Sequence, residues 1–177
     1  MATRQKKSCL KNESESIPMK NALEVDSAMI EGLLAEAQSA ARLRKNLNFH
    51  ERAEHPCQRL LNAIVPGSYV RPHRHIDVNK DEFMIVVKGC MGVVLFDAQG
   101  TVTRKMKLEE NGPVRAISIP AGVFHTCVAL APTVIFEAKG GPYAPNLPEE
   151  IAAFAPAEGS PEAPRFLREM ELLFAEA

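Results

Sequence analysis

The first regular pattern of apolar positions covers residues 27–44. Apolar side chains recur there at the spacing of one helical face, at Ile30, Leu33, Leu34, Ala37 and Ala41. Asp26 or Ser27 is available to cap the start, and basic residues stand near the end, where the helix dipole favours positive charge. The pattern predicts an amphipathic helix that packs with one side on the rest of the protein.

After residue 44 the pattern changes from helical to β. Residues 45–50 are polar and aromatic and predict a connector, and Pro56 prevents a helix from continuing. Strand-forming residues then follow in short runs at 59–65, 82–88, 92–96, 101–108, 115–119, 126–130 and 134–138. Turn-forming Gly, Pro and Asn residues separate these runs. Short strands at such regular intervals predict a mainly β fold, either a sandwich or a barrel.

Prolines cluster between residues 142 and 164, and a short amphipathic pattern follows. One helical face of residues 165–174 carries the apolar side chains of Phe166, Leu167, Met170, Leu173 and Phe174. This predicts a wrapped segment that ends in a docked helix. The expected organisation is a disordered tail (1–22), a helix with its connector (23–57), a β-barrel (58–141) and a Pro-rich segment that packs on the barrel (142–177).

The composition is that of a globular protein, with 46% hydrophobic and 24% charged residues. The formal net charge of -1 gives no reason to expect nucleic acid or an anionic membrane as a partner. No apolar run is long enough for a membrane-spanning helix or a signal-peptide core. The four cysteines contain no Cys-x-x-Cys pair, which favours a reducing compartment. We therefore expect a cytoplasmic protein without membrane insertion.

Candidate chemistry is concentrated in three histidines and one carboxylate. His73 and His75 stand two positions apart, so their imidazoles point to the same side of an extended segment. Glu82 and His125 can complete a metal site with them. This mixed ligand set suits one divalent transition metal ion, Zn or Fe(II) in the first place and Ni or Mn as alternatives, and it leaves coordination positions open for water or substrate.

Two other carboxylates, Asp77 and Asp81, compete with Glu82 as the fourth ligand. Glu82 shares strand parity with Met84 and Val86 in the predicted strand at 82–88. Its side chain is therefore expected on the same face as these apolar residues, which favours Glu82.

The histidines belong to two spaced motifs that resemble those of the cupin superfamily. The first motif comprises Gly67, His73, His75, Glu82 and Gly89, with a longer interval before the glutamate than is usual. The second motif comprises Pro120, Gly122 and His125. The resemblance implies that both motifs contribute ligands to one metal ion.

A more specific resemblance is to the WbuC family of cupin-fold metalloproteins, over roughly residues 25 to 165. The similar segments are 42–50 (RLRKNLNFH), 58–63 (QRLLNA), 69–75 (YVRPHRH), 141–143 (GPY) and 154–159 (FAPAEG). The resemblance implies a double-stranded β-helix, or jelly roll, with one bound metal. Members are often encoded among genes for O-antigen, a part of lipopolysaccharide, and for related surface polysaccharides, and no reaction is established for them.

Further polar residues are candidates for contacts with a substrate. Arg71 has the parity of the two motif histidines, so its guanidinium can point into the same cavity and hold a carboxylate or phosphate, or else form a salt bridge with an acidic neighbour. The cavity mouth has four candidate lining residues, for which capping or packing is the alternative role: Asn46, Asn48, His50 and Tyr143. For His50 a hydrogen-bonding role is favoured over metal ligation.

These residues favour a small metalloenzyme, of isomerase or epimerase type, that acts on a polar or anionic small molecule such as a sugar. Its candidate catalytic residues are Glu82, Arg71 and Tyr143. Two alternatives stay open: an Fe(II)-dependent oxygenase, and a non-catalytic sugar-binding or regulatory module that depends on a metal. Because β domains of this type commonly pair through an edge strand or an N-terminal arm, we also expect a homodimer.

Overall fold

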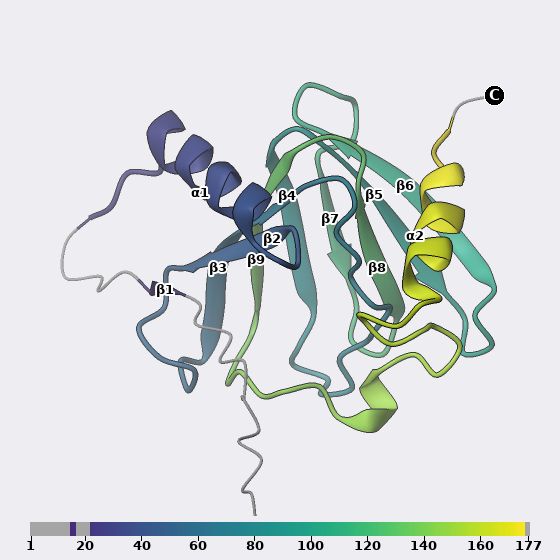
Figure 1. Cartoon of the computed structure of the whole chain (residues 1–177). Coiled ribbons are helices and arrows are strands. Elements are labelled where there is room, and N and C mark those ends of the chain that lie inside the picture. Colours follow the sequence, from purple (N-terminus) through teal and green to yellow (C-terminus); the bar gives the residue numbers. More distant parts are fainter. Residues whose placement is uncertain (1–14, 17–21, 176–177) are drawn as a thin grey trace, which may run out of the picture.

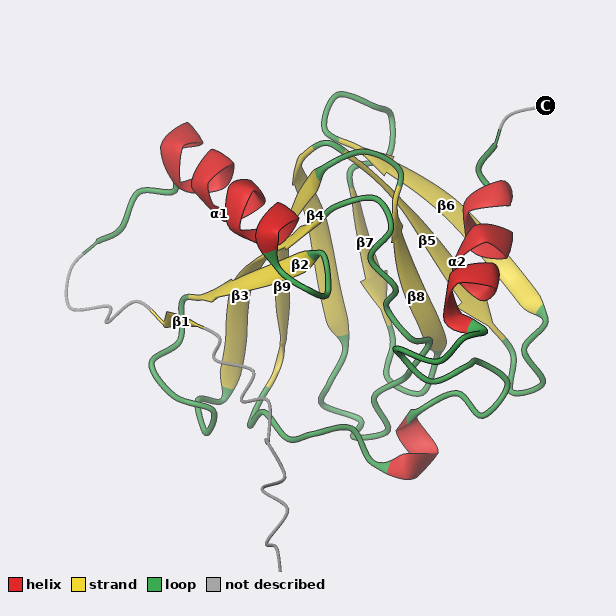
Figure 2. Ribbon diagram, viewed as in Figure 1, coloured by secondary structure: helices red, strands yellow, loops and turns green. Residues whose placement is uncertain are grey.

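The computed structural model describes residues 15–16 and 22–175, so most of the tail predicted at 1–22 lies outside the described residues. The described strands form two β-sheets that face each other, and one α-helix lies on the outside of each sheet (Figure 1). Loops and one short 3-10 helix connect these elements (Figure 2). None of the described helices combines the length and the apolar character needed to cross a membrane.

The larger sheet contains, in spatial order, β1 (Glu15–Ser16), β2 (Arg44–Asn48), β3 (Cys57–Ile64), β9 (Thr133–Gly140), β4 (Glu82–Lys88) and β7 (Ala116–Ile119). The smaller sheet contains β6 (Val102–Glu109), β5 (Cys90–Phe96) and β8 (Phe124–Ala129). Neighbouring strands are antiparallel, except for β1 with β2. In the larger sheet β9 lies between β3 and β4, and in the smaller sheet β5 lies between β6 and β8, so strands that are distant in the sequence are neighbours, as in a jelly roll. The predicted mainly β fold class is confirmed.

The space between the sheets is filled by the inward-facing residues of each strand. Side chains of a strand alternate between its two faces, so every second residue contributes to this interior. The buried residues packed there are Met84, Val86, Met91, Val93, Leu108, Ile119, Cys127 and Ile135. Polar residues continue the same inward rows, because Glu82 precedes Met84 by two positions and His125 precedes Cys127 by two. One end of the interior is thus apolar and the other is polar.

Helix α1 (Ser27–Ser39) covers the outer face of the larger sheet (Figure 1). The carboxylate of Asp26 caps its start by accepting a hydrogen bond from the Met29 N–H, at 2.8 Å. Leu33, Leu34 and Ala37 are buried against apolar side chains of the sheet. The predicted amphipathic helix is confirmed in type and in the face that it buries.

The helix ends five residues earlier than expected, and the predicted connector at 45–50 is largely strand β2. Leu43 adopts a left-handed backbone conformation with φ 55°, which turns the chain back after the helix. The next five residues pair with β3, from Arg44 opposite Ile64 to Asn48 opposite Leu60. The prediction was wrong here because pairing with a buried neighbour decides the conformation of a segment whose own preference is weak.

The C-terminal part wraps around the smaller sheet. It contains the 3-10 helix η1 (Pro148–Glu150) and helix α2 (Ala163–Leu172). The apolar side of α2, including Leu167 and Met170, is buried against outward-facing residues of the smaller sheet such as Val94 and Val128. The predicted docked helix at the end of the chain is confirmed.

Candidate metal centre

Three separate segments bring the four predicted ligands together. His73 and His75 lie on the extended segment before β4, Glu82 begins β4, and His125 lies in β8. The His73 N–H donates to the His125 carbonyl at 3.0 Å, and the His125 N–H donates back at 2.8 Å. One ligand atom from each of the four side chains lies within 4.8 Å of the others. This is the spacing of groups that could share one metal ion.

Backbone carbonyls fix the orientation of two imidazoles. Nδ1 of His73 lies 3.0 Å from the Arg71 carbonyl, and Nδ1 of His125 lies 2.9 Å from the Val123 carbonyl. A carbonyl only accepts, so each Nδ1 carries the hydrogen and each Nε2 keeps a lone pair. Nε2 of His125 is buried without a hydrogen-bond partner among the described residues, and it lies 3.4 Å from Glu82 Oε2. An unsatisfied buried nitrogen beside a carboxylate fits a metal ion between them.

The surroundings of the cluster favour a neutral His73 and an ionised Glu82, which are the states that ligate metals. Burial lowers the pKa of His73 to about 3, and the neighbouring His125 adds to this effect. Burial opposes ionisation of Glu82, but Lys139 and the histidines His125 and His75 outweigh it and hold the pKa of this carboxyl well below its usual range. For His125 burial is outweighed by the Glu82 carboxylate, which raises its pKa. A metal ion would take the place of that proton.

The competing carboxylates lie outside the cluster. Asp77 accepts a hydrogen bond from the Asn79 N–H, and Asp81 accepts one from the Ala121 N–H, both at 2.9 Å. Both aspartates are exposed, whereas Glu82 is buried and lies 3.0 Å from Nε2 of His75. The geometry therefore selects Glu82 as the candidate carboxylate ligand.

A buried ion pair that the sequence did not suggest lies beside Glu82. Glu82 pairs with Lys139 of the neighbouring strand β9, and Lys139 Nζ lies 2.8 Å from Glu137 Oε1. Burial raises the pKa of Glu137, and the nearby Glu82 carboxylate raises it further although Lys139 opposes this. Burial opposes the charge of Lys139, but the two carboxylates outweigh burial and raise its pKa. The sequence did contain a signal for this pair. Glu137 and Lys139 follow the apolar Ile135 by two and four positions in β9, so their side chains lie on the same face of the strand as this buried residue.

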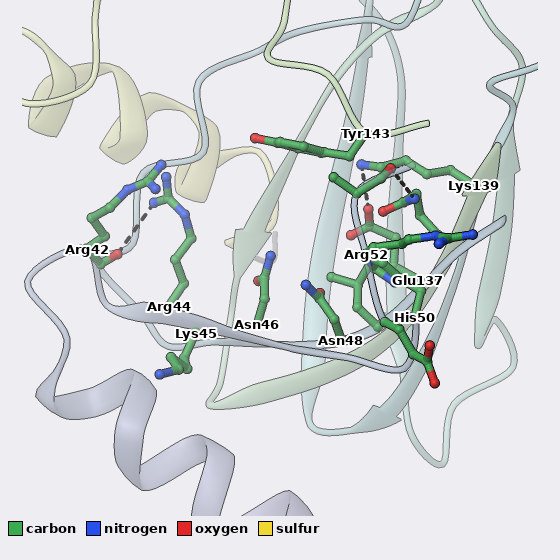
Figure 3. Close-up of a pocket in the computed structure, with 14 residues that line it drawn as sticks. Arg42, Arg44, Lys45, Asn46, Asn48, His50, Arg52, Glu137, Lys139 and Tyr143 are labelled. Carbon is green, nitrogen blue, oxygen red and sulfur yellow. Dashed lines mark hydrogen bonds and ion pairs between the residues drawn. The ribbon is translucent and has the colours of Figure 1, made fainter. Parts of the chain in front are cut away.

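A polar cavity of about 410 Å³ adjoins this ion pair (Figure 3). Glu137 and Lys139 line it from β9, and Arg52 lines it from the loop after β2. The cavity also brings together the four residues predicted at the mouth: Asn46, Asn48, His50 and Tyr143. The lining of this cavity does not include the four residues of the metal cluster, and the roles of Asn46, Asn48, His50 and Tyr143 toward a ligand stay predictions.

His50 and Arg71 are held by backbone groups. Nδ1 of His50, a buried residue, lies 3.0 Å from the Arg59 carbonyl and 3.1 Å from the Arg59 N–H. His50 therefore has the expected hydrogen-bonding role and does not join the metal cluster. The Arg71 guanidinium donates to the carbonyls of Ala152 and Ala155, at 3.2 and 2.9 Å. These bonds tie Arg71 to the C-terminal segment, away from the residues that line the cavity.

The C-terminal segment also holds the strand of the two motif histidines. The buried carboxylate of Glu150 accepts a hydrogen bond from the N–H of Ile76, at 2.9 Å, directly after His75. The Glu150 carbonyl accepts another from the Arg74 N–H, at 2.8 Å. His73 forms a β-bridge with Ile151. The sequence gave no sign of this support, because the partners are more than seventy residues apart.

Comparisons with known proteins add a family model and several folds. A model described as a domain of unknown function, DUF6016, matches residues 25–108. No curated protein matches the chain. Among solved structures, the conserved SPY1581 protein of unknown function from Streptococcus pyogenes is 12% identical, with 74% of this chain and 97% of that chain covered and a TM-score of 0.49.

Two further structures are similar at comparable levels. KdgF from a Halomonas species is 23% identical, with 55% of this chain and 79% of that chain covered and a TM-score of 0.43. A cupin superfamily protein, DSY2733, from Desulfitobacterium hafniense is 13% identical, with 55% and 76% covered and a TM-score of 0.44. Of these three structures DSY2733 is named as a cupin superfamily protein, and none of the three is named as a WbuC protein. The chemistry of this chain therefore follows from its own residues.

Proposed function

We propose that this protein binds one divalent transition metal ion and is an enzyme for a sugar or a sugar-derived polar substrate. The observation that carries the proposal is the convergence of His73, His75, Glu82 and His125, whose ligand atoms lie within 4.8 Å of one another. Three imidazole nitrogens and one carboxylate oxygen suit Zn or Fe(II), with Ni or Mn as alternatives.

A bound ion would supply Lewis-acid chemistry, polarising a carbonyl or hydroxyl oxygen of the substrate. The chain contributes imidazoles whose Nε2 atoms are available to the ion, because carbonyl groups hold the hydrogen of His73 and His125 on Nδ1. The buried carboxylate of Glu82 contributes a negative charge to the cluster. At the cavity mouth, the Tyr143 hydroxyl can donate to or accept from a substrate hydroxyl, and so can the Asn46 amide.

The segments that resemble the WbuC family support a link to surface polysaccharides. The segment 42–50 supplies Asn46, Asn48 and His50 to the cavity lining, and the segment 69–75 supplies His73 and His75 to the metal cluster. The resemblance is thus concentrated in the residues that build the site. On this basis we propose a role in the biosynthesis of O-antigen or a related surface polysaccharide.

Elemental analysis of protein purified without chelator or affinity metal tests the metal, with X-ray absorption on the same sample to count ligands. The expected result is nearly one metal ion per chain with mostly imidazole ligation. Protein that stays metal-free after reconstitution with Zn, Fe(II), Ni and Mn would contradict the proposal.

The identity of the metal and the response to sugars separate the enzyme from its alternatives. Iron together with oxygen consumption would favour an oxygenase. Thermal stabilisation by a sugar ligand without any turnover would favour a binding module. Turnover supported by a metal of fixed valence, such as Zn, is the result that we expect.

A further inference from the structure

The cavity beside the metal centre has an excess of basic side chains. Its lining includes the five basic residues Arg42, Arg44, Lys45, Arg52 and Lys139. Only two carboxylates, Glu51 and Glu137, line it with them. An excess of positive charge in a concave site favours an anionic ligand. Which of the basic groups can reach such a ligand depends on the partners that they already have.

At one end of the cavity the arginines are committed to the protein (Figure 3). Arg42 Nη2 and Arg44 Nη2 lie 2.7 and 2.8 Å from the two carboxylate oxygens of Glu158. Nη1 of Arg44 also donates to the Tyr69 carbonyl at 2.9 Å. These guanidinium groups hold β2 to the C-terminal segment, so this end of the cavity is structural.

At the other end, Arg52, Lys139 and Glu137 line the cavity (Figure 3). An ammonium group has three donors, and Glu137 Oε1 is the ion-pair partner of Lys139 among the described residues. Arg52 is exposed, and its guanidinium forms no hydrogen bond or ion pair within the described part of the chain. Both side chains therefore keep donors for a ligand in the cavity.

We propose that Arg52 and Lys139 bind the oxyanion group, a carboxylate or phosphate, of a small hydroxylated ligand. A guanidinium fork matches the two oxygens of such a group, and an ammonium adds a point charge. Between the two ends, Asn46 and Tyr143 contact the hydroxyl groups of the ligand (Figure 3). The assignment rests on the proposed function for the identity of the cavity as the substrate site, and it narrows the substrate to an anionic one.

The size of the cavity limits the ligand further. A volume of about 410 Å³ is near the lower end of small-molecule sites. It accommodates a single sugar-sized molecule rather than an oligosaccharide. The ligand class is therefore a sugar acid or a sugar phosphate.

Isothermal titration calorimetry with D-gluconate, D-glucose 6-phosphate and D-glucose tests the assignment on the protein as purified. At least one of the two anions is expected to bind about tenfold or more tightly than D-glucose, because hydrogen bonds to charged groups are the stronger ones. Which anion binds distinguishes a carboxylate from a phosphate site. Arg52→Ala is expected to weaken anion binding about tenfold.

Arg165→Ala is the matched control, because this arginine is 86% exposed on α2 and, within the described part of the chain, pairs with Glu169 on the surface. It should leave anion binding unchanged. The assignment is overturned if D-glucose binds as tightly as both anions, if neither anion binds, or if Arg52→Ala binds the anion as wild type does.

Elemental analysis of the same samples separates this assignment from the metal proposal. Anion binding that depends on Arg52 in a protein without metal would support the anion site and reject the metal enzyme. Full metal content, together with anion binding that Arg52→Ala does not change, would support the metal proposal and reject the anion site at Arg52.

Discussion

The metal cluster and the neighbouring cavity differ in how the fold holds their side chains. His73 and His125 lie on segments that exchange two backbone hydrogen bonds, and both imidazoles are oriented by carbonyls. The cavity side chains come mainly from β2 and the loop after it, and Arg52 and Tyr143 are exposed. The cluster is therefore preorganised for one small ion, whereas the cavity can adapt to a flexible organic ligand.

The two regions also differ in their energetic cost. The cluster buries a carboxylate and two imidazoles, including an unsatisfied Nε2 of His125, which is unfavourable without a bound ion. The exposed polar groups of the cavity, Arg52 and Tyr143, are in contact with water, so they cost little before a ligand binds. Changes in the cluster should thus act mainly on metal affinity, and changes in the cavity on ligand affinity.

The largest expected effect is the loss of one cluster imidazole. His73→Ala should weaken metal binding about hundredfold or more, because one of four ligands is lost from a rigid site. Competition with a chromophoric chelator measures the dissociation constant. His55→Ala is the matched control, since His55 lies outside the cluster and should keep wild-type affinity. Full metal occupancy of His73→Ala would remove this histidine from the site.

The same contrast explains how much the sequence could predict. The cluster was predictable because His73 and His75 stand two residues apart, because Glu82 shares strand parity with Met84, and because all three belong to spaced motifs. The jelly roll was predictable because turn residues separate its short strands. Both signals can be read from the spacing of residues in the sequence, without knowledge of the tertiary structure.

The cavity was only partly predictable, for physical reasons. In β2 the inward-facing Asn46 and Asn48 are polar because they line a cavity, so the apolar alternation that indicates a strand is absent. Arg52 lies in a loop whose conformation depends on distant contacts. The prediction that Arg71 points into the cavity assumed a regular strand through residues 71–75. The structure has only isolated β-bridges there, at His73, and Arg71 contacts the C-terminal segment.

The next largest effect is expected at the ion pair between the two regions. Lys139→Met should lower the free energy of unfolding by about 3 kcal/mol, because the buried carboxylate of Glu137 loses its compensating charge. Urea unfolding of the metal-loaded protein measures the change. Lys107→Met removes a lysine from an exposed pair with Glu109 and should cost less than about 1 kcal/mol.

The double variant Lys139→Met, Glu137→Gln tests the reason for this loss. Neutralising Glu137 removes one uncompensated charge, so part of the lost stability should return. If Lys139→Met is as stable as Lys107→Met, the ion pair does not stabilise the boundary between the cluster and the cavity.

A smaller effect should arise from the support behind the cluster. Glu150→Gln is expected to weaken metal binding about tenfold. This is the loss of metal affinity that is typical when a residue that orients a metal ligand is replaced. The Glu150 carboxylate accepts from the N–H groups of Ile76 and Leu147, at 2.9 and 2.8 Å. Glutamine keeps one acceptor and turns an NH₂ group toward the other N–H, which loosens the strand of His75.

Glu149→Gln is the matched control for the variant at Glu150. The Glu149 side chain is exposed, and only its backbone carbonyl binds Arg74, at 3.1 Å. Chelator competition on both variants should show a change for Glu150→Gln alone. Equal affinities would mean that the metal strand needs no support from the C-terminal segment.

The smallest effect concerns the structural end of the cavity and depends on pH. Burial opposes ionisation of Glu158, but Arg42 and Arg44 outweigh it and hold its pKa below the usual 4.5. A carboxyl with a lowered pKa stabilises the fold above its unfolded-state pKa, and this contribution is lost as the pH falls through the folded-state value. Glu158→Gln should therefore cost about 1 kcal/mol at neutral pH, a modest value because the pairs are partly exposed to water and salt.

Urea unfolding of wild type and Glu158→Gln at neutral pH and at about pH 3 measures this contribution. The difference between the two proteins should shrink at the acidic pH, where the wild-type carboxyl begins to bind a proton. A difference that is as large at acidic pH would mean that Glu158 acts through packing and not through its charge.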